Sequence, residues 1–545
     1  MVSLGSWQRL VFELILFAFI VRWNEGLSGY EADSWGTEFI FILPQNSHLN
    51  RAACHIFGMD KQKNITVNIE YNVLSSKNNG SKVGKKKDKL VIRAAYEYDF
   101  HNLTMNDTVE GLHMLADHRI HITSSEKISI IAYVFDTKSA AVDYFLVHPV
   151  GMGGDYYAFS LPGRGTMTLY FLPFGATNET IAQSHGVHNV SITVRQNNKL
   201  ETVKQTMKAG SLWQYTAPVE QTISIWIRDQ LNNPNITKRR SKVRTISNVE
   251  IARLIVIASV RSIPMSEDNT TNFGCFMPTP IIVDRCAKLT DPVYYPTSEE
   301  FANNLLLTAP SHLCPQDEID IRSSMKEDPK SLLVKWDEAA ERISLKDEFL
   351  KKTFAIISGT TIMNIVHYGG NNGSFLHEIP AYSQWVNGDS SVVVPKDSKA
   401  TLYVLADDYG REATMEGFEY PYFETVEDVS TDFSLYLYTR SLNPGVYRVG
   451  IDQELGGRYI AILISEMNRH SIGYVAAINL HRISPPIFLK YSTTVDLTTT
   501  ELTTTPLMVS TMTTVTTTQA ASLSVLANSL LAIYVCFLAY DESEQ

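Results

Sequence analysis

A nine-residue stretch occurs twice in this sequence and constrains its fold more than any other feature. Gly36-Thr-Glu-Phe-Ile-Phe-Ile-Leu-Pro44 and Gly154-Asp-Tyr-Tyr-Ala-Phe-Ser-Leu-Pro162 share a skeleton of Gly, two variable residues, an aromatic residue, Phe two places later, and Leu-Pro. Aromatic and β-branched residues suit a half-buried strand, the leading Gly permits a turn, and the final Pro ends backbone pairing. The stretch therefore predicts a strand that opens a module.

Two further matches follow in the same order. The segment that begins Asn64-Ile-Thr-Val is echoed from Asn189, and the segment that begins Ile122-Thr-Ser-Ser is echoed from Ile246. The three offsets are 118, 125 and 124 residues. Three matches in register indicate a tandem duplication.

The duplication predicts a mainly β fold built from tandem antiparallel β-sandwich modules. We expect module 1 at residues 29–153 and module 2 at residues 154–290, because the intervening segments alternate apolar and polar residues between turn signals. In this arrangement Phe39 and Phe41 correspond to Tyr157 and Phe159.

The pattern changes after residue 290. Thr297-Ser-Glu-Glu300 fits a capping box before a Leu-rich run, and residues 329–352 are charged and amphipathic. The sequence therefore predicts a small helical insert at residues 291–352. A third β-rich module is expected at residues 353–488.

The N-terminus has the layout of a secretory signal peptide. Arg9 precedes an apolar run from Val11 to Val21, and small residues follow. We expect residues 1–28 to be this signal, because the run is short for a membrane span. An uncleaved anchor is the alternative.

The C-terminal part predicts a stalk and a membrane attachment. Residues 489–522 are dominated by Thr, a composition that buries no core and is typical of a disordered, O-glycosylated stalk. Residues 523–540 form an apolar stretch followed by an acidic end. This stretch is expected to be a single membrane span or the signal for a lipid anchor, with the span slightly favoured.

Sequons and cysteines agree with an extracellular location. We expect N-glycosylation at nine Asn-x-Ser/Thr sites: Asn64, Asn79, Asn102, Asn106, Asn178, Asn189, Asn235, Asn269 and Asn372. Four cysteines in the body of the chain suggest disulfides, namely Cys54, Cys275, Cys286 and Cys314. We favour a bridge between Cys275 and Cys286 across a Pro-containing segment, with unpaired thiols as the alternative, and leave the pairing of Cys54 and Cys314 open.

One part of the sequence resembles a known family. Ile128-Ser-Ile-Ile-Ala-Tyr-Val-Phe135, then Asp143-Tyr-Phe-Leu-Val-His-Pro149, then Gly154-Asp-Tyr-Tyr resemble the IgGFc-binding protein N-terminal domain. The opening Trp35-Gly-Thr-Glu-Phe-Ile-Phe is similar to the start of that domain, and residues 251–260 and 275–280 supply counterparts. The resemblance covers roughly residues 35–370 and rests on hydrophobic patterns.

The resemblance implies an extracellular protein associated with mucus and surface adhesion. It transfers no binding residue to this sequence. The chain lacks the long cysteine-rich von Willebrand-type repeats of the vertebrate member, which argues against a role in mucin cross-linking.

Charge and motifs narrow the classes of function. The net charge of -11 argues against nucleic-acid binding. The sequence contains no zinc-protease, nucleophile-elbow, phosphate-loop or Cys-x-x-Cys motif, so we predict no catalytic residue, no cofactor and no metal. An acidic loop could offer oxygen ligands to calcium, but its spacing does not match an EF-hand and a solvated turn is the simpler interpretation. Its residues are Asp407, Asp408, Glu412 and Glu416.

A basic segment, Asn78 to Lys89, reads as a turn-rich loop. It could bind heparin or another anionic surface, although a solvated hairpin tip explains it more simply. We expect a non-enzymatic, glycosylated cell-surface protein that acts in adhesion or recognition of a protein or glycan. The alternatives are a structural component of matrix or mucus that is secreted and, less favoured, a carbohydrate-active enzyme.

Overall fold

Alternating burial shows why these segments form strands in the computed structural model. In β3 (Ile65–Ser75), the side chains of Ile65, Val67 and Ile69 are fully buried, whereas Asn68 between them is exposed. Such a period of two covers one face of a sheet and leaves the other to solvent. The fold is mainly β with antiparallel sheets, which confirms the predicted fold class.

The structure describes residues 32–480 apart from 45–50, 61, 76–81, 102, 104–108, 117, 136–141, 175–186, 197–198, 232–252, 265–270, 282–290, 297–301, 310–315, 324–329, 337, 339, 345–353, 359–362, 371–372, 408–413, 416–424, 429–434, 451–456 and 468–469. The predicted signal peptide, stalk and C-terminal apolar segment lie outside this range. Within the described part of the chain, no helix is long and apolar enough to cross a membrane.

The first sandwich, copy one, consists of two sheets that share one long strand. The first part of β7 (Ile120–Phe135) pairs with β1 and β3, and its second part pairs with β2 and β8. This joins the two sheets into one seven-stranded sheet. The other strands are β1 (Gly36–Phe41), β2 (Arg51–Gly58), β4 (Lys82–Ile92), β5 (Ala95–Asp99) and β8 (Val142–Val147).

Copy two repeats this strand order with the long strand divided into β14 and β15, in agreement with the tandem duplication. Its first sheet has the order β12-β11-β14-β9, which corresponds to β4-β3-β7-β1. Its second sheet has the order β16-β15-β10-β13, which corresponds to β8-β7-β2-β5, and β6 (Gly111–Met114) extends it. The strands are β9 (Tyr156–Leu161), β10 (Arg164–Phe174), β11 (Val187–Gln196), β12 (Lys199–Lys208), β13 (Trp213–Val219), β14 (Ile223–Leu231), β15 (Arg253–Pro264) and β16 (Thr271–Phe276).

Residues 291–379 form a third copy, so the predicted helical insert at residues 291–352 is wrong. The sheets β17-β22-β19-β20 and β24-β23-β18-β21 have the same order as those of copy two. Three consecutive leucines of β18, Leu305 to Leu307, are fully buried because both faces of this strand are covered. A continuous apolar run of this kind has no period of two and is indistinguishable from a helix by pattern alone. The strands are β17 (Val293–Pro296), β18 (Ala302–Leu307), β19 (Gln316–Ser323), β20 (Lys330–Lys335), β21 (Glu341–Ser344), β22 (Phe354–Ser358), β23 (Ile365–Gly370) and β24 (Phe375–Ile379).

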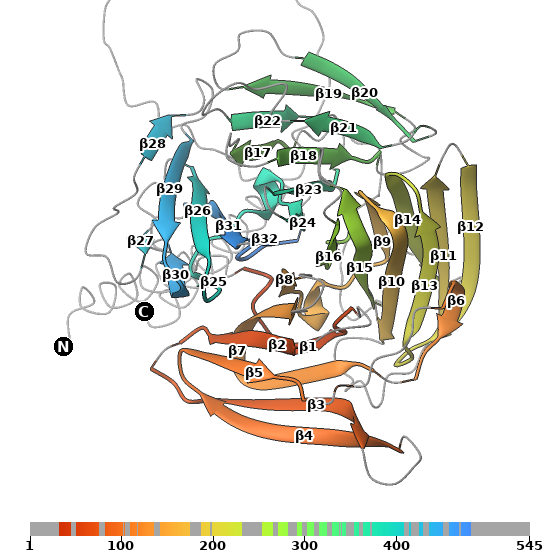
Figure 1. Ribbon diagram of the computed structural model, residues 1–545, viewed down its shortest axis with the longest axis vertical. Coiled ribbons are helices and arrows are strands. Elements are labelled where there is room, and N and C mark those ends of the chain that lie inside the picture. Colours follow the sequence, from red (N-terminus) through yellow and green to blue (C-terminus); the bar gives the residue numbers. More distant parts are fainter. Residues whose placement is uncertain are drawn as a thin grey trace, which may run out of the picture. The chain divides into compact units, whose positions relative to one another are not determined.

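A fourth copy occupies residues 390–475, which also corrects the expected single module at residues 353–488. Its sheets are β25-β30-β27 and β32-β31-β26-β29, and β28 pairs with β29 instead of β27. The strands are β25 (Ser390–Val394), β26 (Lys399–Ala406), β27 (Thr414–Met415), β28 (Thr425–Asp428), β29 (Tyr436–Leu442), β30 (Gly445–Gly450), β31 (Tyr459–Met467) and β32 (His470–Val475). Figure 1 follows the copies from orange through yellow and green to blue. Short 3-10 turns precede copies two and four, η1 (Val150–Met152) and η3 (Tyr382–Gln384).

Each copy packs the outer face of its second sheet against the preceding copy. The core of copy one includes Ile257 and Cys275 of copy two, and the core of copy two includes Leu376 of copy three. The core of copy three includes Ile462 of copy four, and the core of copy four includes Tyr144 of copy one. The last strands β8, β16, β24 and β32 contact one another in this order, and β32 contacts β8. Head-to-tail contacts that return to the first copy close a ring.

The two ends of the ring are joined by a short pairing that we call the latch, residues 32–35 with residues 478–480. The backbone N–H of Ser34 donates to the carbonyl of Ile478 at 3.0 Å, and the N–H of Leu480 donates to the Asp33 carboxylate at 2.9 Å. The indole N–H of Trp35 donates to the Asp389 carbonyl of copy four at 2.9 Å. The latch therefore ties the start of copy one to the end of copy four.

Glycine permits the closest approach between the last strands. A Cβ added to Gly473 of β32 would lie 2.7 Å from the ring of Phe375 in β24. A Cβ added to Gly84 of β4 would meet only Val73, at an ordinary 3.8 Å. The contact between copies three and four therefore requires a residue without a side chain.

We expect Gly473→Ala to destabilise the protein by about 1–3 kcal/mol, the usual cost of overpacking a filled core. Gly84→Ala is the matched control and should be neutral or slightly stabilising, because alanine restricts the unfolded chain. Chemical denaturation of both variants measures the difference. Equal stabilities would show that the close packing of β32 on β24 does not hold in solution.

Candidate functional site

Polar side chains gather on the outer face of the second sheet of copy one. The register places His55 of β2 opposite Glu97 of β5, and Ala53 opposite both Asp99 and Tyr133. Because alternate residues of a strand share a face, side chains from β2, β5 and β7 meet there. We call this group the Arg51 cluster: Arg51, His55, Glu97, Asp99 and Tyr133.

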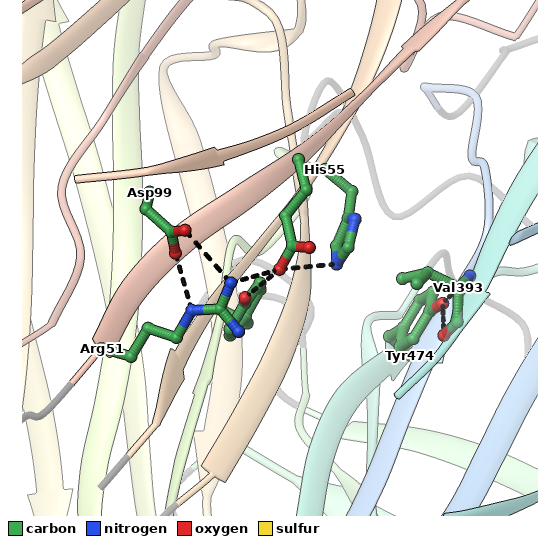
Figure 2. Close-up of polar contacts among 7 residues, drawn as sticks. Arg51, His55, Asp99, Val393 and Tyr474 are labelled. Atoms are coloured by element: carbon green, nitrogen blue, oxygen red, sulfur yellow. Dashed lines mark hydrogen bonds and ion pairs between the residues drawn. The ribbon is translucent and has the colours of Figure 1, made fainter. Parts of the chain in front are cut away.

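Arg51 is the centre of the cluster. Its Nε lies 2.6 Å from Oδ1 of Asp99 (Figure 2). Its Nη2 lies 2.8 Å from Oε1 of Glu97. The hydroxyl of Tyr133 donates to the same Glu97 oxygen at 2.5 Å. The side chains of Arg51 and Glu97 are 46% and 39% exposed, so these ion pairs lie at the surface.

A stack of aromatic rings leads from the cluster to copy four. The rings of Tyr133 and Tyr144 are 4.6 Å apart and nearly parallel, and the rings of Tyr144 and Tyr474 are 6.3 Å apart. The Arg51 guanidinium covers the Tyr133 ring at 5.5 Å. At the far end, the Tyr474 hydroxyl donates to the carbonyl of Val393 at 2.9 Å and accepts from its N–H at 2.8 Å (Figure 2).

Burial and charge shift the protonation equilibria of the cluster. Burial and the hydrogen bond to Glu97 raise the pKa of Tyr133, so its hydroxyl stays a donor. The hydrogen bond to Asp99 raises the pKa of Arg51. Burial and the nearby Arg51 charge lower the pKa of His55, against the opposing effect of Glu97. The imidazole is therefore neutral at physiological pH.

The arrangement suits binding and support more than proton transfer. The cluster places one guanidinium between two carboxylates. The partly exposed carboxylates of Glu97 and Asp99 can also accept hydrogen bonds from a ligand at the surface. The rings of Tyr133 and Tyr144 are buried and offer no free face. The buried stack of tyrosine rings therefore mainly stabilises the junction of copies one and four.

Two buried carboxylates hold other junctions together. Asp143 of β8 accepts hydrogen bonds from the N–H of Cys275 at 2.5 Å and of Tyr144 at 2.9 Å. Glu378 of β24 accepts from the N–H of Thr279 at 2.7 Å and from its hydroxyl. Burial raises the pKa of Asp143 well above its ordinary value and that of Glu378 to about 8.

The cysteines differ from the expected disulfides. Cys54 and Cys275 are both buried free thiols, so the expected bridge from Cys275 to Cys286 is absent from the structure. The reason is direction: Cys275 points from β16 into the core of copy one, beside Asp143. Cys286 and Cys314 lie outside the described residues.

Two of the expected glycosylation sites are described, and both reach solvent. Asn64 is exposed, and its Oδ1 accepts a hydrogen bond from Nε of Arg93 at 2.9 Å. Asn189 is partly exposed on β11, and its Oδ1 accepts from the Thr206 hydroxyl at 3.0 Å. The expected sites outside the described residues are Asn79, Asn102, Asn106, Asn178, Asn235, Asn269 and Asn372.

Among the described residues, no three His, Cys, Asp or Glu side chains are placed to hold a metal ion. Of the acidic loop considered for calcium, only Asp407 is described, and it is buried. Its oxygens accept from the Tyr382 hydroxyl and from the N–H of Arg458, each at 3.0 Å. Asp407 therefore has a structural role in copy four.

The Arg51 cluster was missed at the level of sequence. Polar residues at alternate positions were the available signal, since Arg51 and His55 lie on one side of β2, and Glu97 and Asp99 lie on one side of β5. Their meeting depends on the pairing of two strands far apart in the chain. The residue pattern of either strand by itself does not predict that register.

Comparisons with known proteins give no relative. No protein-family model matches the sequence, and no curated protein matches it. Among solved structures, the arabinofuranosyltransferase AftD from Mycobacteria aligns at 7% identity and a TM-score of 0.13, covering 77% of this chain and 38% of AftD. A mutant of AftD aligns at 8% identity and a TM-score of 0.09, covering 78% and 39%. The chain thus spans well under half the length of AftD, and likenesses this low carry no conclusion.

We expect Cys54 and Cys275 to react with iodoacetamide only after unfolding. Burial raises the pKa of both thiols and keeps the reactive thiolate scarce. Peptide mass mapping of protein alkylated before and after denaturation, without reductant, measures this. A bridged Cys275, seen as a peptide pair that separates on reduction, would restore the disulfide expected from the sequence.

The buried Glu378 makes stability depend on pH. Its folded pKa of about 8 lies above the value near 4.3 of an unfolded glutamate, so the stabilisation is fully present below about pH 4 and is lost as pH rises through 8. We expect the melting temperature to fall less between pH 5 and 8.5 in Glu378→Gln than in the wild type. Glu318→Gln, at an exposed position of β19, is the control. Parallel curves for all three proteins would show that Glu378 is not protonated in the fold.

Proposed function

We propose that this chain is a non-enzymatic, glycosylated recognition protein of the cell surface that acts in adhesion to an extracellular protein or glycan. The observation that carries the proposal is the latch. It brings both ends of the four-copy ring together, because Asp33 and Ser34 bind residues 478–480 directly. The two described ends of the ring therefore lie at one place, which suits attachment of the ring by one end.

The segments outside the ring fit this role. The Thr-rich residues 489–522 follow the latch closely in sequence and suit a stalk, and residues 523–540 suit a membrane attachment. Asn64 and Asn189 offer glycans at solvent-facing positions of β-sheets. The resemblance to the IgGFc-binding protein N-terminal domain supports an extracellular role in adhesion.

Display of the full chain on cells that do not adhere tests the proposal. We expect cells that carry the chain to bind partner cells or immobilised secreted glycoproteins at least several-fold more than cells that carry the empty vector. Surface staining and sensitivity of the chain to peptide N-glycosidase confirm display and glycosylation. Adhesion equal to the control despite surface staining would overturn the proposed function.

Treatment with a phospholipase distinguishes a membrane span from a lipid anchor. A membrane span predicts that the displayed chain stays on the cell after treatment with phosphatidylinositol-specific phospholipase, and release would show a lipid anchor. Full-length protein found only in the medium would contradict attachment altogether.

A further inference from the structure

The hairpin of β3 and β4 carries a row of exposed lysines. Lys85, Lys87 and Lys89 alternate along β4 and point to solvent, and we call them the lysine face. Side chains two residues apart on a strand are about 6.6–6.8 Å apart. Figure 1 shows this hairpin in orange. The lysines that were expected in a loop thus form a regular strip on a strand.

The one lysine between them, Lys86, points to the opposite side of the strand and contacts other side chains. Lys86 lies 5.5 Å from the ring centre of Tyr71 and 5.8 Å from that of Tyr98. It also pairs with Asp88 at 3.0 Å. Lys86 therefore belongs to the packing of copy one, in contrast to the lysine face.

Glu70 of β3 fixes two members of the lysine face. Its oxygens lie 2.6 Å from Nζ of Lys85 and 2.6 Å from Nζ of Lys87, while these lysines remain 55% and 64% exposed. The hydrogen bonds from these two lysines lower the pKa of Glu70 to about 2. One carboxylate thus holds two ammonium groups in place, which lowers the entropic cost of presenting them to a ligand.

Neighbouring groups on the same face are polar. Asn68 lies opposite Lys89, and its amide donates to the Thr123 hydroxyl at 3.4 Å. His121 of β7 pairs with Glu38 of β1 at 3.0 Å, so this carboxylate is already engaged. The strip therefore combines three cations, the carboxylate that pairs with two of them, and amide and hydroxyl groups that can bind sugar oxygens.

The equivalent strands of copies two and three show that the strip is not a requirement of the fold. β12 occupies the place of β4 in copy two, and its exposed lysines, Lys199, Lys204 and Lys208, do not alternate. The outward residues of β20 in copy three include Ser331 and Leu333. Lysine on an edge strand protects against aggregation, but β12 achieves this without a continuous row.

We propose that the lysine face binds sulfated glycan chains. The chain as a whole carries a net charge of -11, so a row of cations on it is a local feature complementary to a polyanion. Three ammonium groups in line match the repeated charges of a linear polymer better than a single small anion. This inference rests on the proposed function, because it names the class of ligand that one face would recognise.

The test measures binding of the purified full chain to a heparin oligosaccharide and to its desulfated form at 0.15 M NaCl by surface plasmon resonance. We expect Lys85→Gln/Lys87→Gln/Lys89→Gln to weaken binding by at least about tenfold, a loss of roughly 1.4 kcal/mol. Lys199→Gln/Lys204→Gln/Lys208→Gln removes the same charge from β12 and should stay within about twofold of the wild type. The corresponding Lys→Arg triple of the lysine face should retain binding and shows that the strand is intact.

Three results would overturn the site: equal losses in the two Gln triples, no loss in the first, or equal binding of desulfated heparin. Binding to phosphatidylserine vesicles through the lysine face, without binding to heparin, would assign the site to a membrane surface instead. The adhesion assay run on the same variants separates the two proposals. Heparin binding without any cell adhesion would confirm the site and overturn the proposed function, whereas adhesion without heparin binding would overturn the site alone.

Discussion

Burial of the outer face of each second sheet against the preceding copy is the constraint on which this fold depends. These faces carry residues such as Ile257, Leu376 and Ile462, which no single sandwich can cover by itself. Four copies placed head to tail leave one uncovered face on copy one, with Tyr133 and Tyr144. That face is buried only because copy four returns to it. The hydrophobic effect therefore favours the closed ring over any open array.

The polar groups at the junctions follow from the same constraint. Asp143 accepts the backbone N–H of Cys275 in copy two, and Glu378 of copy three accepts that of Thr279, which follows copy two; a buried donor needs such an acceptor. Both carboxylates are neutralised readily, because burial raises their pKa. The Arg51 cluster marks the outer limit of another junction, where charged groups can still reach water. Its ion pairs are exposed and contribute little to stability by themselves.

Local patterns predicted part of this fold, and the reasons for the failures are physical. The first two copies share an opening strand motif, so their duplication could be read from the sequence. Copy three opens with the shorter Val293–Pro296, and β18 is buried on both faces, which removed the period of two and favoured a helix. The disulfide expected at Cys275 was wrong because the direction of this side chain, into the core of copy one, depends on packing between copies. The Arg51 cluster depends on register in the same way.

The latch also bears on what chain order means in this protein. Asp33 and Ser34 contact residues 478–480 as closely as strands within one copy contact each other, so the ring has no structural beginning. The four copies keep the same neighbours wherever the chain is opened between them. A chain that joined Leu480 to Ala32 and began instead before copy two would form the same contacts.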